Sequence, residues 1–404
     1  MNLLFIHGSF PGQFLKLAPF LSSKTSGRTV FLTQSTNPQN LSFPGVEIVR
    51  FECHRNVSKG IHDYLSQPEQ CVLRGQAVVK ALDQLLQQGF KPDVVISHAA
   101  MGFGMYIKAL LPNVRLISYV EWFFQPETST HLFSSFSIND NLRIRTYMWP
   151  LVEEMQQADD LVCPTHWQRS QFPLPWRERI QVIFDGIDEQ CFQPIRLDGE
   201  LLLETGTTGH KVDLKSGEKI LAYATRGMEP LRGFPEFMRA AALAQQSDPK
   251  VQVVIAGHDR VAYSYKSAHS SGSWKQQMLE ELSGQLDLSR LHFPGLLQYG
   301  ELAKLMQRSD LYCYFTRPYV VSWSVFEAAA CGSRMLVNQF GGIDEVFHES
   351  PFLGPVDLDD QEQINRAVLK GLSMDWPRDY IQSLLPPGMG LSVAQDAWLK
   401  LLNG

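Results

Sequence analysis

The sequence lacks the common fingerprints of several enzyme classes. It contains no GxGxxG, no GxxxxGK[ST], no HExxH and no GxSxG. The first two absences exclude the usual dinucleotide and P-loop turns, and the others argue against a dedicated metal and a nucleophile elbow. We therefore expect chemistry that needs no cofactor and no bound metal.

Cysteine pairs, long apolar runs and excess positive charge are also missing. The six cysteines are scattered without a CxxC pair, which is typical of free thiols in a reducing compartment. No apolar run approaches the roughly 18 residues that span a membrane, and the N-terminus MNLLFIHGSF resembles a buried strand more than a signal peptide. The formal net charge of −6 argues against a nucleic-acid binder. These features predict a cytoplasmic protein.

The length of 404 residues and the hydrophobic content of 44% predict two or three globular domains. Short apolar runs such as LLFIHG, DVVISH and KILAYATRG alternate with amphipathic segments in both halves. This alternation predicts an α/β protein with two Rossmann-like, doubly wound parallel-sheet domains facing a cleft. The polar, Gly- and Thr-rich residues 194–218 break the rhythm, and we interpret them as a linker.

The expected domain boundaries follow from this pattern. We expect residues 1–200 to form the first domain and residues 201–375 the second, with a helical segment at 376–404 that returns to the first. In doubly wound sheets, ligands bind beyond the carboxyl ends of the strands. Side chains that follow the predicted strands are therefore the first candidates for a site.

Two arginines follow the first predicted strand of the second half. Arg226 and Arg232 lie beside glycines in ATRGMEPLRGF. Planar guanidinium groups match phosphate oxygens, so the pair suits a diphosphate. The alternative is a pair of surface arginines, one of them bound to Glu229. The position at a strand end favours phosphate binding.

A single carboxylate, Glu327, lies in the small-residue helix predicted in SWSVFEAAACG. Ser324 and Glu327 have the spacing of a capping box, a purely structural motif, and in isolation this is the stronger interpretation. In the alternative, Glu327 accepts hydrogen bonds from ribose or sugar hydroxyls, while free N–H groups at residues 322–325 hold a phosphate or a sugar hydroxyl.

Three features of the first half admit both a structural and a functional interpretation. The glycine turn in FIHGSFPGQF could bring N–H groups to an anion, or serve only as a tight turn, which is the commoner case. His98 ends a predicted strand, where it could contact a substrate oxygen or be a satisfied structural histidine. Glu121 and Trp122 at another strand end fit a sugar-stacking platform or, equally, ordinary core and rim.

Taken together, these segments resemble the family 4 glycosyltransferases, which have the GT-B fold. In the first half the resemblance rests on HGSFPGQFLKLAPFL, GFKPDVVISHAAMGFGMYIK and CPTHWQRSQFP, and it points to the N-terminal domain of one subgroup. In the second half it rests on ATRGMEPLRGF and SVFEAAACGSRMLVNQFGGIDEV. The latter is similar to the segment that holds the second glutamate of the family's E-x7-E signature. The resemblance covers nearly the whole chain.

The resemblance implies a retaining, metal-independent transferase of the hexosyltransferase type that uses a nucleoside-diphosphate sugar. Arg226 and Arg232 would neutralise the donor diphosphate, Glu327 would hold the donor ribose, and His98 would contact the transferred sugar. The family mechanism is front-face attack, in which the protein contributes positioning and charge stabilisation. Further residues implied in donor binding are Gly12, Gly227, Ser322, Trp323, Ser324 and Tyr319. The implied acceptor side comprises Gln13, Glu121 and Trp122.

The sequence departs from the family pattern at two positions. Tyr319 stands where the family has the first glutamate of E-x7-E, and Arg232 replaces a lysine and lies one residue further along. Tyr319 leaves open a non-catalytic sugar-nucleotide-binding or scaffolding protein, and a sugar-nucleotide epimerase would share the fold. The acceptor could be a glycan, a lipid-linked molecule or a small molecule. A lipid-linked acceptor would bring a peripheral contact with the inner face of the membrane.

Overall fold

The computed structural model describes residues 1–35, 43–205, 211–347, 354–374 and 382–404. Contacts divide the chain into two compact units. The first unit comprises residues 1–129, 136–186 and 392–404, and the second comprises 130–135 and 187–391. Residues 130–135, 187–200 and 382–391 of the second unit fall outside the range expected for the second domain, 201–375.

The first unit is built on a parallel sheet of seven strands in the order β3-β2-β1-β4-β5-β6-β7. The strands are β1 (Leu3–His7), β2 (Thr29–Thr33), β3 (Val46–Arg50), β4 (Val94–His98), β5 (Arg115–Tyr119), β6 (Asp160–Cys163) and β7 (Ile180–Val182). The strands β1, β2 and β4 are buried throughout, because helices cover both faces of a doubly wound sheet. Strands β1 and β4 confirm the strands expected from the apolar runs LLFIHG and DVVISH.

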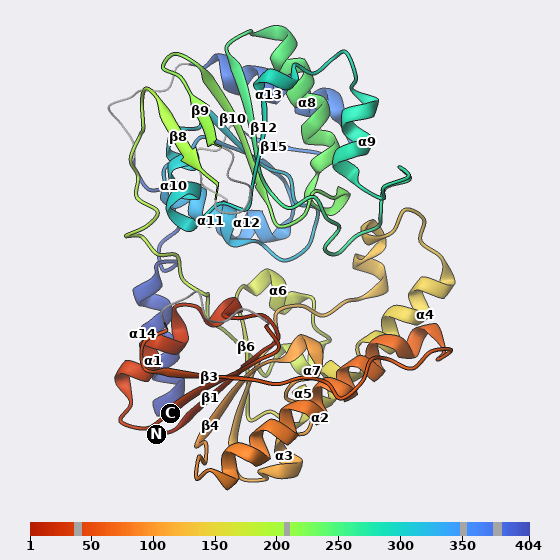
Figure 1. Ribbon diagram of the computed structural model, residues 1–404, viewed down its shortest axis with the longest axis vertical. Helices are drawn as coiled ribbons and strands as arrows, with labels where there is room; N and C mark the ends of the chain where they lie inside the picture. The colour runs from red at the N-terminus through yellow and green to blue at the C-terminus, as the bar shows by residue number, and fades with distance from the viewer. Residues whose placement is uncertain (36–42, 206–210, 348–353, 375–381) are drawn as a thin grey trace. The chain divides into compact units, whose positions relative to one another are not determined.

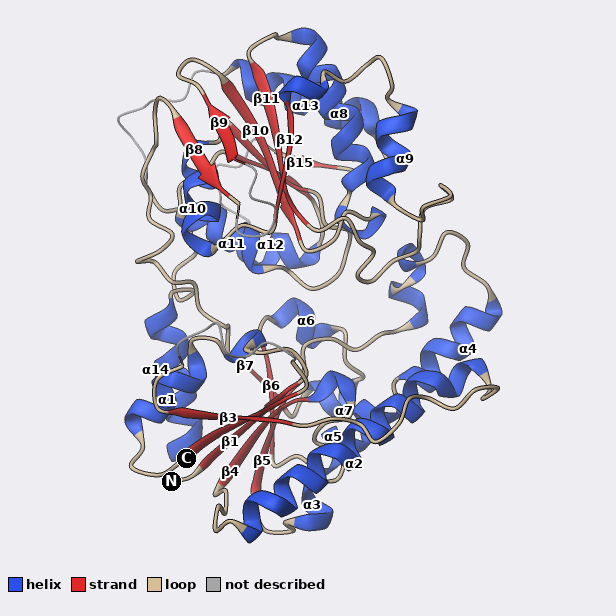
Figure 2. Cartoon of the chain, in the orientation of Figure 1, coloured by secondary structure: helices blue, strands red, loops and turns tan. Residues whose placement is uncertain are grey.

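Helices lie on both sides of this sheet (Figures 1 and 2). They are α1 (Leu17–Lys24), α2 (Ser66–Gln87), α3 (Ile107–Leu110), α4 (Ile138–Tyr147), α5 (Trp149–Gln157), α6 (His166–Ser170), α7 (Leu174–Arg177) and α14 (Leu391–Asn403). Short 3-10 turns are η1 (Gly12–Phe14), η3 (Asp63–Leu65), η4 (Ala99–Met101) and η5 (Pro126–Thr128). The last helix, α14, lies beside α1 in Figure 1, and its Trp398 joins the core that contains Phe5 and Leu21.

The second unit contains a parallel sheet of six strands in the order β12-β11-β10-β13-β14-β15. The strands are β10 (Lys219–Thr225), β11 (Val251–Gly257), β12 (Leu291–Gly295), β13 (Leu311–Tyr314), β14 (Met335–Asn338) and β15 (Pro355–Val356). Its helices are α8 (Phe234–Ser247), α9 (Trp274–Glu281), α10 (Tyr299–Arg308), α11 (Trp323–Ala330), α12 (Gly341–Phe347) and α13 (Gln361–Ser373). The 3-10 turns η6 (Thr130–Leu132), η7 (Pro230–Arg232) and η8 (Leu288–Arg290) also belong to this unit. The parallel α/β architecture expected for the second half is confirmed.

The interpretation of residues 194–218 as a linker is wrong. Two strands in this range, β8 (Leu201–Glu204) and β9 (Lys211–Leu214), pair antiparallel, while residues 206–210 lie outside the described residues. Leu203, Val212 and Leu214 are buried, and their neighbours in the strands are exposed or partly exposed. Alternating burial of this kind holds a hairpin against a helical layer, and the polar outward residues made the segment resemble a linker.

Both sheets reverse their strand order at one place, between β1 and β4 in the first unit and between β10 and β13 in the second. Loops after two adjacent strands then turn to opposite faces, which leaves a crevice at the carboxyl edge where ligands bind. His7 and His98 end the two strands at the first switch point, and Arg226 follows β10 at the second. The topology thus places candidate side chains where each sheet can bind a ligand.

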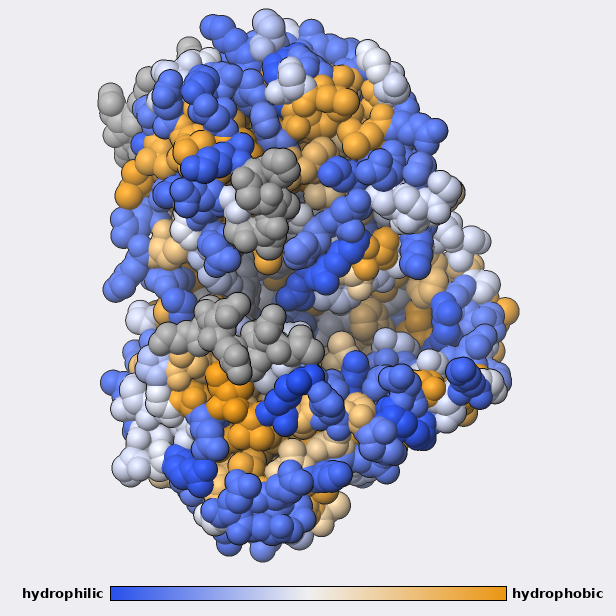
Figure 3. All heavy atoms as spheres, viewed as in Figure 1, coloured by the Kyte–Doolittle hydropathy of each residue, from blue (hydrophilic) through white to orange (hydrophobic). Residues whose placement is uncertain are grey.

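Hydrophobic residues are interspersed with hydrophilic ones over the face shown in Figure 3. The most exposed large apolar side chains include Ile138, Leu174 and Leu288. Within the described part of the chain, no helix combines the length and the apolar character needed to cross a membrane.

Candidate active site

Arg232 is buried at the carboxyl edge of the second sheet, at the end of η7. Its Nη1 donates to the hydroxyls of Thr316 (3.2 Å) and Ser322 (3.4 Å), and the Tyr223 hydroxyl donates to its carbonyl oxygen (2.6 Å). No carboxylate among the described residues forms an ion pair with this guanidinium. Arg232 is therefore not a surface arginine. A buried cation without a counter-ion is costly unless an anionic ligand supplies the opposite charge.

Two tyrosine rings flank the Arg232 guanidinium. Its Cζ lies 5.9 Å from the ring centroid of Tyr263 and 5.7 Å from that of Tyr319, and the two rings lie 5.3 Å apart. This geometry fits cation–π contacts. The Tyr263 hydroxyl also accepts a hydrogen bond from Nη1 of the exposed Arg226 at 3.2 Å. Tyr319 thus contributes an aromatic face to the arginine site, where the family resemblance implied a carboxylate.

The buried carboxylate of Glu229 holds the loop that carries Tyr263. Its Oε2 accepts hydrogen bonds from the backbone N–H groups of Ala262 (3.1 Å), Tyr263 (3.0 Å) and Ser264 (2.9 Å). The Ser264 hydroxyl donates to the same oxygen at 3.0 Å. Charge-assisted bonds of this kind fix a loop firmly. Glu229 therefore positions the tyrosine that touches both arginines, a role that the sequence did not indicate.

Glu327 lies inside α11 and not at its cap. The N-cap of this helix is Ser322, whose side chain makes no capping bond, so the capping box of Ser324 and Glu327 does not form and that interpretation is wrong. Glu327 is 5% exposed, and nothing among the described residues donates a hydrogen bond to its carboxylate. Burial raises its pKa to about 8. A buried carboxylate without partners favours a ligand that donates hydrogen bonds to it.

The start of α11 is tied to β13 through Tyr314. Both the backbone N–H and the hydroxyl of Ser322 donate to the Tyr314 hydroxyl at 3.0 Å. The N–H of Val325 donates to the Ser322 carbonyl oxygen at 3.3 Å. The expectation of four free N–H groups at residues 322–325 is therefore wrong for Ser322 and Val325. Trp323 and Ser324 lie partly exposed in the first turn.

In the first unit, His7 and His98 meet at the switch point of the sheet, with ring centroids 4.5 Å apart. Nε2 of His7 lies 2.7 Å from Oε1 of Gln13, and the Gln13 amide nitrogen donates to Oε1 of Glu121 at 2.9 Å. The second oxygen of Glu121, Oε2, lies 3.7 Å from Nε2 of His98. The fold thus brings together three predicted residues and one, His7, that was not singled out.

His98 is not a satisfied structural histidine. Neither ring nitrogen has a hydrogen-bond partner among the described residues, although the residue is only 6% exposed. The ring stacks on Tyr119, with centroids 5.7 Å apart and planes 28° apart. Buried polar atoms are almost always paired, so these two nitrogens favour a partner that a substrate would supply.

Trp122, the residue after Glu121, is buried beside Trp167. It is 6% exposed, and its ring centroid lies 6.4 Å from that of Trp167 in α6. The Gln168 side chain donates from Nε2 to the carbonyl oxygen of Glu121 at 2.9 Å, so α6 supports the loop after β5. The burial of Trp122 argues against an exposed sugar-stacking platform and favours a role in packing.

Two of the predicted glycines allow the backbone to approach another group closely. A Cβ on Gly12, which has φ of 56°, would lie 2.4 Å from Nε2 of His7. A Cβ on Gly227 would lie 2.7 Å from the carbonyl oxygen of Arg260. Real Cβ atoms do not approach other atoms so closely, so any side chain here would displace His7 or the loop after β11.

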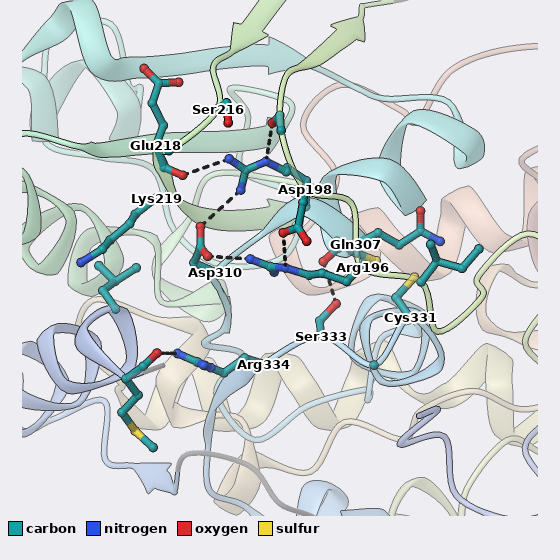
Figure 4. Close-up of a pocket in the computed structure, with 18 of the residues that line it drawn as sticks. Arg196, Asp198, Ser216, Glu218, Lys219, Gln307, Asp310, Cys331, Ser333 and Arg334 are labelled. Carbon is teal, nitrogen blue, oxygen red and sulfur yellow. Dashed lines mark hydrogen bonds and ion pairs between the residues drawn. The ribbon is translucent and has the colours of Figure 1, made fainter. Parts of the chain in front are cut away.

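A polar pocket of about 310 Å³ lies at the other edge of the second sheet, near the amino ends of β10 and β13 (Figure 4). Three of its charged side chains, Arg196, Arg308 and Asp310, pair with one another. Arg196 donates to Oδ1 of Asp310 at 2.6 Å, and Arg308 donates to Oδ2 at 3.4 Å. Of the described residues that line it, none is a predicted site residue. This pocket is separate from the candidate site.

Sequence reasoning missed His7, Glu229 and Tyr263. His7 ends the run LLFIH in FIHGSFPGQF, and this strand-end position, which it shares with His98, is the signal that could have found it. Tyr263 lies in a loop without regular structure after β11. Its position over Arg232 depends on contacts between residues more than thirty positions apart, which no local pattern reveals.

Comparison with known proteins identifies the family. Residues 26–192 match the glycosyl transferase family 4 group, and residues 208–382 match the glycosyl transferases group 1. The chain belongs to the family 4 glycosyltransferases. The resemblance in the sequence is thereby confirmed, and the protein is a glycosyltransferase. No curated protein matches the sequence.

Solved structures show the same fold at low identity. Alr3699/HepE of Anabaena, crystallised in complex with UDP and glucose, is 15% identical, with a TM-score of 0.66 over 100% of this chain and 99% of that chain. Sucrose-phosphate synthase of Thermosynechococcus elongatus is 14% identical, with a TM-score of 0.69 over 100% and 98%. A putative UDP-N-acetylglucosamine 2-epimerase of Listeria monocytogenes is 14% identical, with a TM-score of 0.54 over 100% and 95%. The expected GT-B fold is confirmed.

Proposed function

We propose that this glycosyltransferase takes its sugar from a nucleoside-diphosphate donor bound at the carboxyl edge of the second sheet. One observation carries the proposal: the buried Arg232 has no carboxylate partner, and the buried Glu327 has no hydrogen-bond donor, among the described residues. A nucleoside diphosphate complements both groups, because its phosphates are anionic and its ribose hydroxyls donate hydrogen bonds.

The proposal gives a role to five predicted site residues of the second unit. Arg226 and Arg232 neutralise the diphosphate as it leaves, and Glu327 binds the ribose hydroxyls. Backbone groups around Trp323 and Ser324, at the positive end of α11, approach the β-phosphate or the sugar. The two arginines supply the positive charge that a divalent metal would otherwise provide, and we propose that the reaction needs neither a metal nor another cofactor.

The first unit contributes His98 in this proposal. Its two buried nitrogens lack partners among the described residues, which suits contact with the transferred sugar near the reacting carbon. No side chain acts as a nucleophile. We propose a hexosyl transfer with retention, in which the acceptor attacks from the front face and the departing phosphate oxygen takes the acceptor's proton. The protein then contributes positioning and charge stabilisation.

The structure of HepE with UDP and glucose makes UDP-sugars the first donors to test. The acceptor is a hydroxyl on a glycan, a lipid-linked molecule or a small molecule. With a lipid-linked acceptor, the protein would act in the cytoplasm at the inner face of the membrane.

Calorimetric titration with UDP, GDP and ADP tests the donor site. We expect saturable binding of one nucleotide and at least about tenfold weaker binding by Arg232→Met, because a hydrogen bond to a charged group contributes about 1.5–3 kcal/mol. Arg239→Met, which removes an exposed guanidinium paired with Glu281, is the matched control and should bind normally. Equal affinity of Arg232→Met and the wild-type protein would exclude the proposed site.

The chemistry is tested by incubating the protein with UDP-, GDP- and ADP-sugars and following the products by NMR. We expect slow release of the nucleotide and of a sugar that keeps its anomeric configuration, with the same rate in EDTA. An inverted product or an EDTA-sensitive rate would contradict the mechanism. Conversion of the donor to its epimer would indicate an epimerase instead.

A further inference from the structure

His7 is held in a defined orientation at the end of β1. It is 8% exposed, its ring edge packs on Phe14 at 5.8 Å, and the backbone of Gly12 covers its ring so closely that no Cβ fits there. Burial, followed by the neighbouring His98, lowers the pKa of His7 to about 3, so its ring is neutral at physiological pH. A neutral imidazole has one nitrogen that donates and one that accepts.

The hydrogen bond from Ser9 decides which nitrogen of His7 carries the proton. The backbone N–H of Ser9 lies 2.9 Å from Nδ1 and can only donate, so Nδ1 must accept. The proton of the neutral ring is then on Nε2, which donates to Oε1 of Gln13 at 2.7 Å. The amide nitrogen of Gln13 in turn donates to Oε1 of Glu121 at 2.9 Å. The direction of every bond therefore follows from one backbone N–H group.

The same sequence of bonds ends beside His98. Oε2 of Glu121 lies 3.7 Å from Nε2 of His98, and a carboxylate attracts the protonated nitrogen of an imidazole. The other carboxylate near His98 is that of Glu154, which is fully buried and accepts hydrogen bonds from the N–H of Gly104 (2.9 Å) and the hydroxyl of Ser118 (3.1 Å). Glu121 is thus the group that can orient the Nε2 side of the His98 ring.

We propose that His7, Gln13 and Glu121 are positioning residues that form a directional hydrogen-bond chain, starting at the Ser9 N–H group, and that this chain holds His98 in its Nε2–H tautomer. His98 then presents Nδ1 as a hydrogen-bond acceptor, which suits a hydroxyl of the transferred sugar and not a carbonyl oxygen. The inference rests on the proposed function only in the identity of that partner. The hydrogen-bond chain itself lies within the first unit.

This inference changes the role expected for two of the predicted acceptor-side residues. The oxygen and the nitrogen of the Gln13 amide both have partners inside the chain, and one oxygen of Glu121 accepts from Gln13. Each contacts its neighbour in the chain, and through it acts on His98. Loss of any link should therefore disturb catalysis more than nucleotide binding, because the arginine site lies in the other unit.

The test is long-range 1H–15N NMR on the full chain with 15N-labelled histidine rings, without any ligand. His7→Asn and His98→Asn spectra identify the two signals. We expect the His7 ring to be a neutral Nε2–H tautomer from pH 7.5 down to pH 5.5, and the His98 ring in its neutral form to carry its proton on Nε2. A His7 ring with the proton on Nδ1, or a neutral His98 ring with the proton on Nδ1, would overturn the inference.

Variants then test the coupling along the chain. Gln13→Leu removes both hydrogen bonds at similar volume, and we expect the His98 signal to shift to a mixture of tautomers. Gln87→Leu, which removes a bond to Asp83 on the exposed face of α2, is the matched control and should leave it unchanged. Glu121→Gln is a second variant that removes the charge and keeps the shape, and it should show the same mixture. An unaltered His98 signal in a folded Gln13→Leu or Glu121→Gln protein would overturn the coupling.

Kinetics provide a separate readout. With the donor that the incubation identifies, Gln13→Leu should lower kcat roughly tenfold, because one oriented hydrogen bond to the sugar is weakened, and leave the donor KM within twofold. A rise in KM alone would overturn the positioning role. Because the NMR experiment needs no nucleotide, it decides this inference even if the donor-binding test fails, and the Arg232→Met result stands whatever the tautomers are.

Discussion

At the scale of single residues, the clearest features are charged groups that the fold buries without the usual partner. Arg232 contacts hydroxyls and aromatic rings, and Glu327 has no donor among the described residues. Each group destabilises the unliganded protein, because desolvation is not offset by an opposite charge. Buried groups of this kind are found where a ligand supplies the missing charge or hydrogen bond. Arg232 and Glu327 together therefore indicate a binding site.

Glu327 should make the unliganded protein less stable as the pH rises. Its pKa is about 8 in the folded state and near 4.5 when unfolded, so between these values only the folded state holds the proton. Stability therefore falls as the pH rises from about 4.5 to 8, by an amount on the order of a few kcal/mol. Glu327→Gln should flatten this dependence and raise the melting temperature at pH 8 by several degrees, as measured by differential scanning fluorimetry.

The outcome distinguishes two roles of the residue. A glutamate with a purely structural role would leave the nucleotide affinity of the Gln variant intact. A ligand-binding glutamate predicts a more stable variant that binds UDP more weakly. A steeper pH dependence in Glu327→Gln than in the wild-type protein would contradict our assignment.

Nucleotide binding should also release a proton from Glu327. At pH 7 the carboxyl is mostly protonated in the unliganded protein, whereas hydrogen bonds from two ribose hydroxyls favour the carboxylate. Calorimetry with UDP in buffers of different ionisation enthalpy should show close to one proton released at pH 7. Glu327→Gln is the control and should release none, and equal proton release by both proteins would exclude Glu327 as the source.

At the scale of elements, the arginine site depends on a loop that one carboxylate holds in place. Glu229, next to η7, accepts three backbone N–H bonds from the loop after β11, and this loop carries Tyr263 across Arg232. The glycine at 227 allows the two segments to touch. The site is therefore assembled from segments that follow three strands, β10, β11 and β13, and the buried charge of Glu229 fixes Tyr263.

Glu229→Gln should loosen this loop. Loss of the charge weakens each of the bonds to the N–H groups of Ala262, Tyr263 and Ser264, since charge-assisted hydrogen bonds are about twice as strong as neutral ones. We expect faster hydrogen exchange at residues 262–264 and roughly threefold to thirtyfold weaker binding of UDP. Glu281→Gln, on the exposed face of α9, is the matched control. Unchanged exchange at residues 262–264 would show that Glu229 does not hold the loop.

The elements themselves were largely predictable, because their causes are local. Strands such as LLFIH and DVVISH are continuous apolar runs, and their periodicity and length distinguish them from the helices between them. The hairpin of β8 and β9 was missed because Glu204, Lys211 and Asp213 in its strands are polar, and the residues between the strands have the composition of a linker. The N-cap of α11 was predicted wrongly for a different reason. Ser322 and Ser324 both suit a cap, and the contact with Tyr314, which the sequence does not reveal, selects Ser322.

At the scale of the whole molecule, the end of the chain completes the core of the first unit. Trp398, Leu401 and Leu402 of α14 are buried against residues of β1 and α1. The carbonyl oxygens of Leu401 and Leu402 accept hydrogen bonds from the Arg115 guanidinium at 2.8 and 3.1 Å. The core of the first unit is therefore formed by the last thirteen residues of the chain together with residues from the first half of the sequence.

Trp398→Ala should destabilise the first unit by about 3–5 kcal/mol, the usual cost of removing a large buried aromatic side chain. Calorimetric unfolding should show a lower melting temperature, while UDP affinity below the transition stays within twofold, because the arginine site lies in the second unit. Val393→Ala, half-exposed on the same helix, is the control and should change the stability little. Equal melting temperatures of the two variants would mean that α14 is not part of the core.

By itself the sequence determined the class of fold, the order of the strands along the chain and the family, since apolar periodicity and short motifs depend on residues close together. It also placed His98 at the end of a strand and Arg226 and Arg232 after one, whereas Glu327 lies inside α11. Only the tertiary structure decided what these residues touch. The hydrogen-bond chain from His7 to Glu121 joins residues more than a hundred positions apart in the sequence. The tyrosines beside Arg232 come from two different loops. Such contacts arise from the order in which parallel strands meet at one edge, and burial then determines which charges lack a partner.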